Sequence, residues 1–442
     1  MISKKQKFKT VVFVLIFALA IVGGVFGISY YKGILTFPWE LTVNQVEDTK
    51  KVEQPEVIEE KVEPVKEEVK EEPKPEVKPE EPEEEIEESE EVEPESTVAN
   101  TGVQLDYYGA LHVEDGNLVD ADGEIAQLTG VSSHGLSWYP EYVSAETIKS
   151  LRENLGINVI RLAVYTSDYN GYCVGGDEVQ SVIKENIDNA VKAATDEDMY
   201  VIIDWHILND NNPNEYKTEA IQFFGEMVRK YKKNENVIYE ICNEPNGDTT
   251  WDDIKKYAKE VIPVIRNVNQ DALILVGTPE WSSDISAAVD DPLEYDNIMY
   301  TYHFYAGSHK ASARISLVSA LEDGLPVFIS EYGLTAANGD GEIDKKEASK
   351  WQEIIDDYQL SSCIWNLSNK DEGSALINSD CDKKADFEYE DYSEQGQYFF
   401  DLLKKHDAKD KSKEDSAKEK DKEDTDEEET EKESNTRETK KK

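Results

Sequence analysis

Between residues 124 and 368, short apolar runs rich in β-branched residues alternate with longer stretches of helical periodicity. The apolar runs predict eight strands, at Ala126–Val131, Val159–Val164, Tyr200–Trp205, Val237–Cys242, Leu273–Val276, Ile298–His303, Val327–Ser330 and Cys363–Asn366. The amphipathic stretches predict helices at Ala145–Leu155, Ile183–Asp196, Lys217–Tyr231, Trp251–Val268, Ile315–Asp323 and Lys345–Gln359. Near-continuous apolar strands are typical of a parallel sheet that is covered on both faces.

Eight strand–helix units over roughly 250–300 residues predict an α/β fold of the (β/α)8, or TIM barrel, type. The alternative is an open doubly wound sheet. It is disfavoured because no Gly-x-Gly-x-x-Gly motif follows the first predicted strand.

The N-terminus carries a long apolar stretch. Lys4, Lys5, Lys7 and Lys9 precede Val11–Ser29, which is nineteen residues without a charge, close to the ~20 needed to cross a membrane. The lysines predict that this end stays inside, which makes residues 1–40 a signal anchor or transmembrane segment with the rest of the chain at the extracellular face. Secretion after cleavage is the alternative, although no Ala-x-Ala site follows.

The composition divides the rest of the chain into three parts. Residues 47–96 contain 23 acidic and 7 basic residues, 7 prolines and no aromatic residue, so residues 41–98 are expected to be a disordered Glu/Pro/Lys linker. Residues 404–442 contain 15 acidic and 13 basic residues, also without an aromatic one, and are expected to be a disordered mixed-charge tail. Residues 99–403 are then the folded domain that contains the predicted barrel.

The charge limits the partners of this domain. It holds 22 basic and 56 acidic residues, which excludes nucleic acid as a partner and favours a neutral polymer. The membrane would be reached through the N-terminal segment only, and we expect a monomer. The four cysteines make no disulfide framework or zinc spacing, and whether Cys173 and Cys381 pair stays open.

Polar residues follow several predicted strands at the end where barrel enzymes carry their chemistry. Glu244 and Glu331 end the fourth and seventh strands. Other strand ends carry Arg161, His206, Asn243, His303, Tyr305 and Trp365. Any one of these could be a structural residue, but burying six of them on one rim without a function would be costly.

Two carboxyl groups, one protonated and one ionised, are the catalytic groups that glycoside hydrolysis requires. The sequence around them resembles the retaining glycoside hydrolases of family 5, over about residues 104–402. The segments that carry the resemblance are Asn243–Pro245, Glu331, Val131–Trp138, Asp204–His206, Tyr302–Tyr305 and Ile364–Gly373. Together they are similar to bacterial endo-β-1,4-glucanases, or cellulases.

The resemblance implies a role for each site residue. Glu244 is expected to be the acid/base and Glu331 the nucleophile, which Arg161 would keep ionised. Asn243 and His206 would contact the reacting sugar, and His303 and Tyr305 would hold the carboxylates. The remaining expected substrate-binding residues are His134, Trp138, Tyr165, Trp281, Trp365, Lys370 and Glu372.

The resemblance implies no cofactor and no metal. Residues 338–344 and 120–124 resemble calcium loops only loosely, and the second is expected to be a hairpin turn. A β-1,4-glucan is the expected substrate. Alternatives are another β-glycanase of the family (a mannanase, licheninase or xyloglucanase) or a non-catalytic surface protein that binds glycans.

Overall fold

The structure is a computed structural model that describes residues 99–405. The predicted anchor, the predicted linker and residues 406–442 of the predicted tail lie outside these residues. Within the described part of the chain, no helix is long and apolar enough to span a bilayer.

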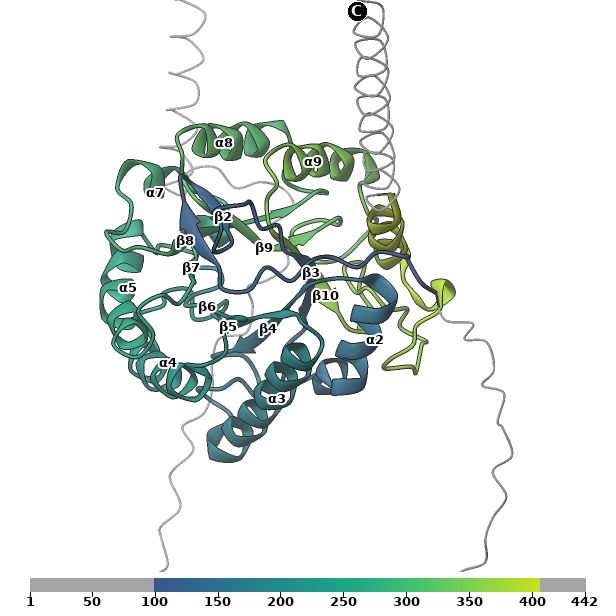
Figure 1. The fold of residues 1–442 in the computed structure, drawn as a ribbon, viewed down its shortest axis with the longest axis horizontal. Helices are drawn as coiled ribbons and strands as arrows, with labels where there is room; N and C mark the ends of the chain where they lie inside the picture. The colour runs from purple at the N-terminus through teal and green to yellow at the C-terminus, as the bar shows by residue number, and fades with distance from the viewer. Residues whose placement is uncertain (1–98, 406–442) are drawn as a thin grey trace, which may run out of the picture. The chain divides into compact units, whose positions relative to one another are not determined.

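Eight parallel strands form a closed barrel in the order β10-β3-β4-β5-β6-β7-β8-β9 (Figure 1). The predicted TIM barrel is therefore confirmed. The strands are β3 (Thr129–Ser133), β4 (Val159–Tyr165), β5 (Tyr200–His206), β6 (Val237–Glu240), β7 (Ile274–Val276), β8 (Ile298–Tyr305), β9 (Val327–Gly333) and β10 (Ser362–Leu367).

Several strands extend further at their carboxyl ends than the apolar pattern predicted. The pairing of β4 with β5 continues to Tyr165 opposite His206, and that of β8 with β9 continues to Tyr305 opposite Gly333. Polar side chains at the rim interrupt the apolar run but not the backbone ladder. As a result, several candidate site residues stand on strands, which are more rigid supports than loops.

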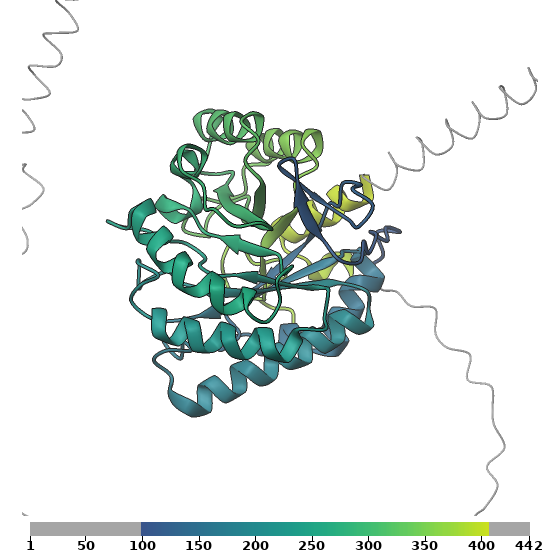
Figure 2. The ribbon, with the colours of Figure 1, turned by 60° about the vertical axis from the view of Figure 1, so that its left-hand side comes forward.

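Helices cover the outside of the barrel (Figure 2). They are α2 (Ala145–Leu155), α3 (Gly176–Asp196), α4 (Lys217–Tyr231), α5 (Trp251–Arg266), α7 (Ser286–Asp290), α8 (Ala311–Glu322) and α9 (Lys345–Asp357), with a further helix over residues 394–405. The short segment α6 (Pro279–Ser282) follows β7 and contacts the segment after β6. The helix α3 begins seven residues before the predicted start at Ile183, because its first two turns are mostly exposed and give no apolar periodicity. Ser144 caps α2, its side chain accepting a hydrogen bond from the Thr147 backbone N–H.

A small hairpin closes the amino-terminal end of the barrel. It consists of β1 (His112–Glu114) and β2 (Asn117–Val119), and its Leu118 joins the apolar cluster formed by strand residues such as Val159 and Tyr200. The predicted turn that follows is present, since Asp120 accepts backbone hydrogen bonds from Asp122 and Glu124. With one end of the barrel sealed, the opposite rim is the face left for chemistry.

Candidate active site

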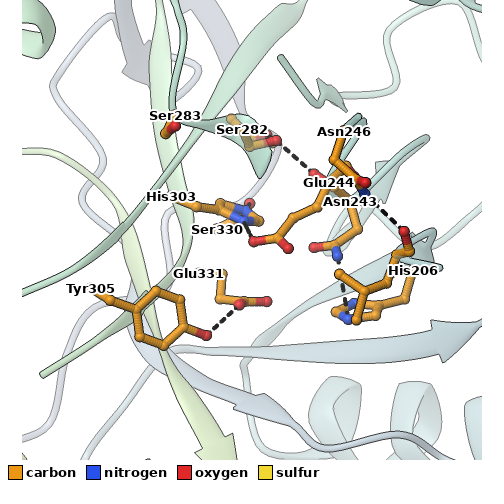
Figure 3. Close-up of polar contacts among 12 residues, drawn as sticks. His206, Asn243, Glu244, Asn246, Ser282, Ser283, His303, Tyr305, Ser330 and Glu331 are labelled. Carbon is orange, nitrogen blue, oxygen red and sulfur yellow. Dashed lines mark hydrogen bonds and ion pairs between the residues drawn. The ribbon is translucent and has the colours of Figure 1, made fainter. Parts of the chain in front are cut away.

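The structure brings the two candidate glutamates together at the carboxyl end of the barrel (Figure 3). Glu331 lies on β9, and Glu244 lies in the segment after β6. One carboxylate oxygen of each, together with a ring nitrogen of His303 on β8, lie within 4.8 Å of one another. Both carboxyl groups are buried, with exposed fractions of 8% for Glu244 and 4% for Glu331.

The segment that carries Glu244 is not a strand, and side chains hold it in place. The Asn246 amide donates hydrogen bonds of 2.8 Å to the carbonyls of Glu244 and Leu208. The Ser282 hydroxyl donates one of 2.6 Å to the Asn243 carbonyl. These hydrogen bonds satisfy backbone carbonyl groups in and beside a segment that is no longer part of the sheet, and they fix the position of Glu244.

The two carboxyl groups have different partners. Glu331 accepts hydrogen bonds of 2.7 Å from the Tyr305 hydroxyl and 3.0 Å from an Arg161 Nη1–H. Glu244 lies 2.9 Å from Nδ1 of His303. One carboxyl group therefore contacts a cation and a phenol, whereas the other contacts an imidazole.

Burial affects the two pKa values unequally. It raises the pKa of Glu244 to about 8. The pKa of Glu331 is also raised, by burial and by Glu244, while His303 and Arg161 oppose the increase. The expected direction of the Arg161 effect is present, but Arg161 does not bring the pKa of Glu331 below its ordinary value. When either group carries a proton, the repulsion between the two disappears, and because Arg161 and Tyr305 both donate to Glu331, the proton of the pair is favoured on Glu244.

Arg161, on β4 and fully buried, is the central cation of the site. Its guanidinium contacts Glu240 in two places, at 2.7 and 3.2 Å, and donates a 2.6 Å hydrogen bond to Asn243 Oδ1. Asp204 lies 3.0 Å from Nη2. The sequence interpretation gave no role to Asp204 or Glu240. The signal that could have found Glu240 is a charged residue inside the apolar strand Val237–Cys242.

His206 is oriented by the same network. Its Nδ1 lies 2.6 Å from Asp204 Oδ2, and its Nε2 lies 3.3 Å from the amide nitrogen of Asn243. Because a carboxylate accepts and an amide N–H donates, the proton of neutral His206 is on Nδ1. Burial and Arg161 hold the pKa of His206 well below its usual range, so the ring is neutral.

Aromatic side chains line one side of the rim. The rings of His206 and Trp365 stack at a centroid distance of 5.3 Å, and Tyr165 lies 4.5 Å from Trp138. His134 lies within 5.5 Å of Trp138 and 5.2 Å of Trp365. These five rings, predicted as separate sugar contacts, form one continuous aromatic surface.

The two predicted charged contacts lie beside this surface. Lys370 Nζ is 2.6 Å from Glu372 Oε2 and 3.3 Å from His134 Nε2. The Asn366 amide donates a 2.8 Å hydrogen bond to Glu372 Oε1. Lys370 and Glu372 are therefore an ion pair joined to the aromatic surface through His134.

Trp281, in the segment after β7, contacts the backbone next to Glu244. Its backbone N–H donates to the carbonyl of Pro245, and its side chain is 47% exposed. Glu280, Trp281 and Ser282 all have positive φ angles, between 55° and 57°. Three consecutive non-glycine residues in the left-handed region are uncommon, and such backbone is found where a side chain is held for function.

The structure also shows where potential metal ligands and cysteines lie. Within residues 99–405, the cluster of Glu244, His303 and Glu331 is the one group of three His, Cys, Asp or Glu side chains placed to share an ion. The loosely calcium-like segments form no such group there. All four cysteines are free thiols, so Cys173 and Cys381 do not pair.

A TIM barrel whose catalytic rim holds two close carboxyl groups beside an aromatic surface defines the class of glycoside hydrolases. The family model of the cellulases, glycosyl hydrolase family 5, matches residues 119–371. The chain therefore belongs to this family, as its sequence predicted.

Relatives and solved structures agree. The chain is 62% identical over 410 residues to Endoglucanase A of Butyrivibrio fibrisolvens, covering 91% of this chain and 95% of the relative. It is 47% identical to an endoglucanase of Clostridium saccharobutylicum, covering 61% and 60% of the two chains. The catalytic domain of endoglucanase Cel5A from Thermobifida fusca, solved with cellotetraose, matches with a TM-score of 0.64 and 31% identity, covering 67% of this chain and 97% of that one. The protein is thus a glycoside hydrolase related to endoglucanases.

Proposed function

We propose that this protein is a retaining endo-β-1,4-glucanase in which Glu244 is the acid/base and Glu331 the nucleophile. The observation that carries the proposal is the 4.8 Å limit on the separation of their nearest oxygens. Retaining enzymes hold the two carboxyl groups about 5–5.5 Å apart, whereas inverting enzymes leave about 6.5–9.5 Å for a water molecule. The 4.8 Å limit agrees with the shorter, retaining spacing, at which one carboxylate attacks the sugar directly.

The protonation states support these roles. With its pKa raised to about 8, Glu244 carries a proton at neutral pH and can give it to the leaving oxygen. Glu331 accepts hydrogen bonds from Tyr305 and Arg161, which stabilise its ionised form. An ionised Glu331 can attack the anomeric carbon and form a covalent glycosyl-enzyme. Glu244, now ionised, then takes a proton from the water that opens this intermediate.

The surrounding residues would position the sugar. We assign Trp365 as the platform under the reacting ring, with Asn243 and His206 close enough to reach its hydroxyl groups. Trp138 and Tyr165 would stack on further rings, because the axial faces of glucose are apolar. Lys370 and Glu372 would contact equatorial hydroxyl groups, and Trp281 would lie under the leaving group.

A β-1,4-glucan is the proposed substrate. The relatives above are named endoglucanases, and the Thermobifida fusca enzyme was solved with cellotetraose. A mannanase, licheninase or xyloglucanase of the same family would use the same two glutamates and differ in its sugar contacts. No metal or organic cofactor has a step in the proposed reaction.

We also propose that the enzyme is tethered at the extracellular face of the membrane. The basis is the uncharged stretch Val11–Ser29, preceded by four lysines and followed by the acidic, proline-rich residues 41–98. Secretion after cleavage remains the alternative. Fractionation of cells that express the full chain distinguishes the two, because only an uncleaved protein stays with the membrane after a salt wash.

The test is hydrolysis by the full chain of carboxymethylcellulose, mixed-linkage β-glucan, xyloglucan and mannan, with Glu331→Ala as the control. Cleavage of the glucans that is lost in the control, with a β-anomer as the first product seen by NMR, is the expected result. Mannan or xyloglucan as the sole substrate would change the specificity but keep the mechanism. An α-anomer as the first product would contradict retention, and binding without cleavage would favour a non-catalytic protein.

A further inference from the structure

A chain of hydrogen bonds runs from Glu244 into the barrel below the site. His303 Nδ1 lies 2.9 Å from Glu244 Oε1, and His303 Nε2 lies 2.9 Å from the Ser330 hydroxyl. The Ser330 hydroxyl in turn lies 2.8 Å from Glu240 Oε1. Ser330 and Glu240 are both fully buried, and neither has a role in the reaction proposed above.

The donors and acceptors in this chain can be assigned one by one. Both carboxylate oxygens of Glu240 accept hydrogen bonds from Arg161 N–H groups. These bonds favour the ionised form of Glu240, although burial raises its pKa. An ionised carboxylate only accepts hydrogen bonds, so the single hydroxyl proton of Ser330 points to Glu240. The Ser330 oxygen then accepts from His303, which places the proton of the neutral ring on Nε2.

We propose that Ser330 and Glu240 are positioning residues that fix His303 in its Nε2–H tautomer and thereby keep the proton of the acid/base on Glu244. In this tautomer, Nδ1 presents a lone pair to Glu244. A protonated Glu244 donates a hydrogen bond to that lone pair, whereas an ionised Glu244 would face it without a proton between them. The proposal rests on the role proposed above for Glu244.

The proton balance is simple. Glu244 gives its own carboxyl proton to the leaving oxygen, and His303 keeps its Nε2 proton throughout. After this transfer, the carboxylate of Glu244 faces the Nδ1 lone pair, which strengthens it as a base. It then recovers a proton from the water that attacks the glycosyl-enzyme, and the site returns to its starting state.

His303 stays neutral because of its surroundings. Burial of the ring and, to a lesser extent, Arg161 on β4 lower its pKa to about 4, against the opposing effect of Glu331 and Glu240. The charged and titratable groups that face it are Glu240 and Glu244 from β6 and the segment after it, Glu331 from β9, His206 from β5, and His309 from the loop after β8.

The first experiment is the pH dependence of kcat/KM on a soluble glucan, measured with the full chain and with Ser330→Ala. Loss of the hydroxyl frees His303 to place its proton on Nδ1, where it donates to ionised Glu244 and lowers its pKa. We expect the basic limb of the profile to move to lower pH by about one unit, the effect of one hydrogen bond to a charged group. No shift would overturn the proposal.

Two variants control for a merely structural effect. Ser330→Thr retains a hydroxyl, so the basic limb is expected to stay at its wild-type position. Ser132→Ala removes an equally buried hydroxyl that contacts Arg161 but not His303, and its basic limb is also expected to stay. A shift in either variant equal to that in Ser330→Ala would overturn the proposal.

A second measurement needs no variant to be active. In the full chain labelled with ¹⁵N-histidine, the Nε2 of His303, identified by its loss in His303→Asn, is expected to carry the proton, and Nδ1 to give the shift of an unprotonated nitrogen. A proton on Nδ1 would overturn the proposal even if hydrolysis behaves as proposed. Conversely, failure of the hydrolysis tests would remove the catalytic role of Glu244 without changing this spectrum.

Discussion

The guanidinium of Arg161 lies 3.0 Å from the carboxylate of Glu331, and among residues 99–405 the same side chain is the one Lys or Arg in contact with Asp204 and Glu240. All four side chains are buried. A single buried cation therefore compensates three carboxyl groups, which makes Arg161 important for folding as well as for the charge of Glu331.

Replacement of Arg161 by methionine is expected to reduce the free energy of unfolding by about 3–5 kcal/mol, the usual cost of leaving buried charges unpaired. Activity should fall as well, because Glu331 loses the cation that opposes its raised pKa. Urea denaturation and initial hydrolysis rates measure the two effects. Arg152→Met is the matched control, since Arg152 is also buried but donates to the carbonyls of Gly156 and Ile157; it should retain activity per folded molecule. Equal loss of activity in both variants would contradict the role of Arg161.

The two glutamates can be told apart by chemical rescue. Glu331→Ala should lose turnover and still bind substrate, and added azide should attack from the vacated side to give an α-glycosyl azide. Glu244→Ala should be rescued on an activated substrate with a β-glycosyl azide as the product, because Glu331 still forms the covalent intermediate. NMR of the isolated azides identifies the anomer. The α-azide from Glu244→Ala would reverse the assignment.

The raised pKa of Glu244 makes activity and stability depend on pH in linked ways. The basic limb of kcat/KM is expected near pH 8, where Glu244 loses its proton. In the unfolded chain the same group titrates near 4.5. Between these values the folded state binds the proton more tightly, so the wild-type protein loses stability as the pH rises from 4.5 to 8.

Glu244→Gln removes this cost, because an amide does not ionise. The variant should match the wild type in stability near pH 4 and exceed it at pH 8 by an amount on the order of 2–4 kcal/mol. Chemical denaturation at the two pH values measures the difference. Glu178→Gln, at an exposed position on α3, should show no such trend. A gain that is independent of pH would show that Glu244 is not the group responsible.

The fold was predictable from the sequence because its signal is local and repeated. Each buried parallel strand is a short apolar run, so all eight strands could be recognised, and six of the covering helices could be recognised by their apolar stripes. The boundaries were less predictable. The first two turns of α3 are mostly polar and exposed, and the strand ends at Tyr305 and Gly333 include polar side chains, so neither follows the pattern that identifies its element.

The rim residues could be predicted for a different reason. In a parallel barrel every strand ends at the same face, so Glu244, Glu331 and their neighbours had to meet once the strands were assigned. The layer below them could not be predicted in this way. Asp204 and Glu240 act through their contacts with Arg161. Those contacts depend on which side chains meet inside the barrel, and the pattern of apolar strand residues does not predict this.

The exposed ring of Trp281 provides a test of which side of the site binds the leaving group. Trp281→Ala should lower kcat/KM for cellopentaose about fivefold, the loss of one stacking contact of about 1 kcal/mol. β-Cellobiosyl fluoride, whose leaving group has no ring, should react at the wild-type rate.

Ile315→Ala is the matched control for this test, since Ile315 is 70% exposed on α8 and has no place in the proposed site. It should leave both substrates unaffected. The comparison depends on the two substrates responding differently, because a general disturbance of the rim by Trp281→Ala would slow both. An equal loss on cellopentaose and on the fluoride would therefore place Trp281 outside the leaving-group side.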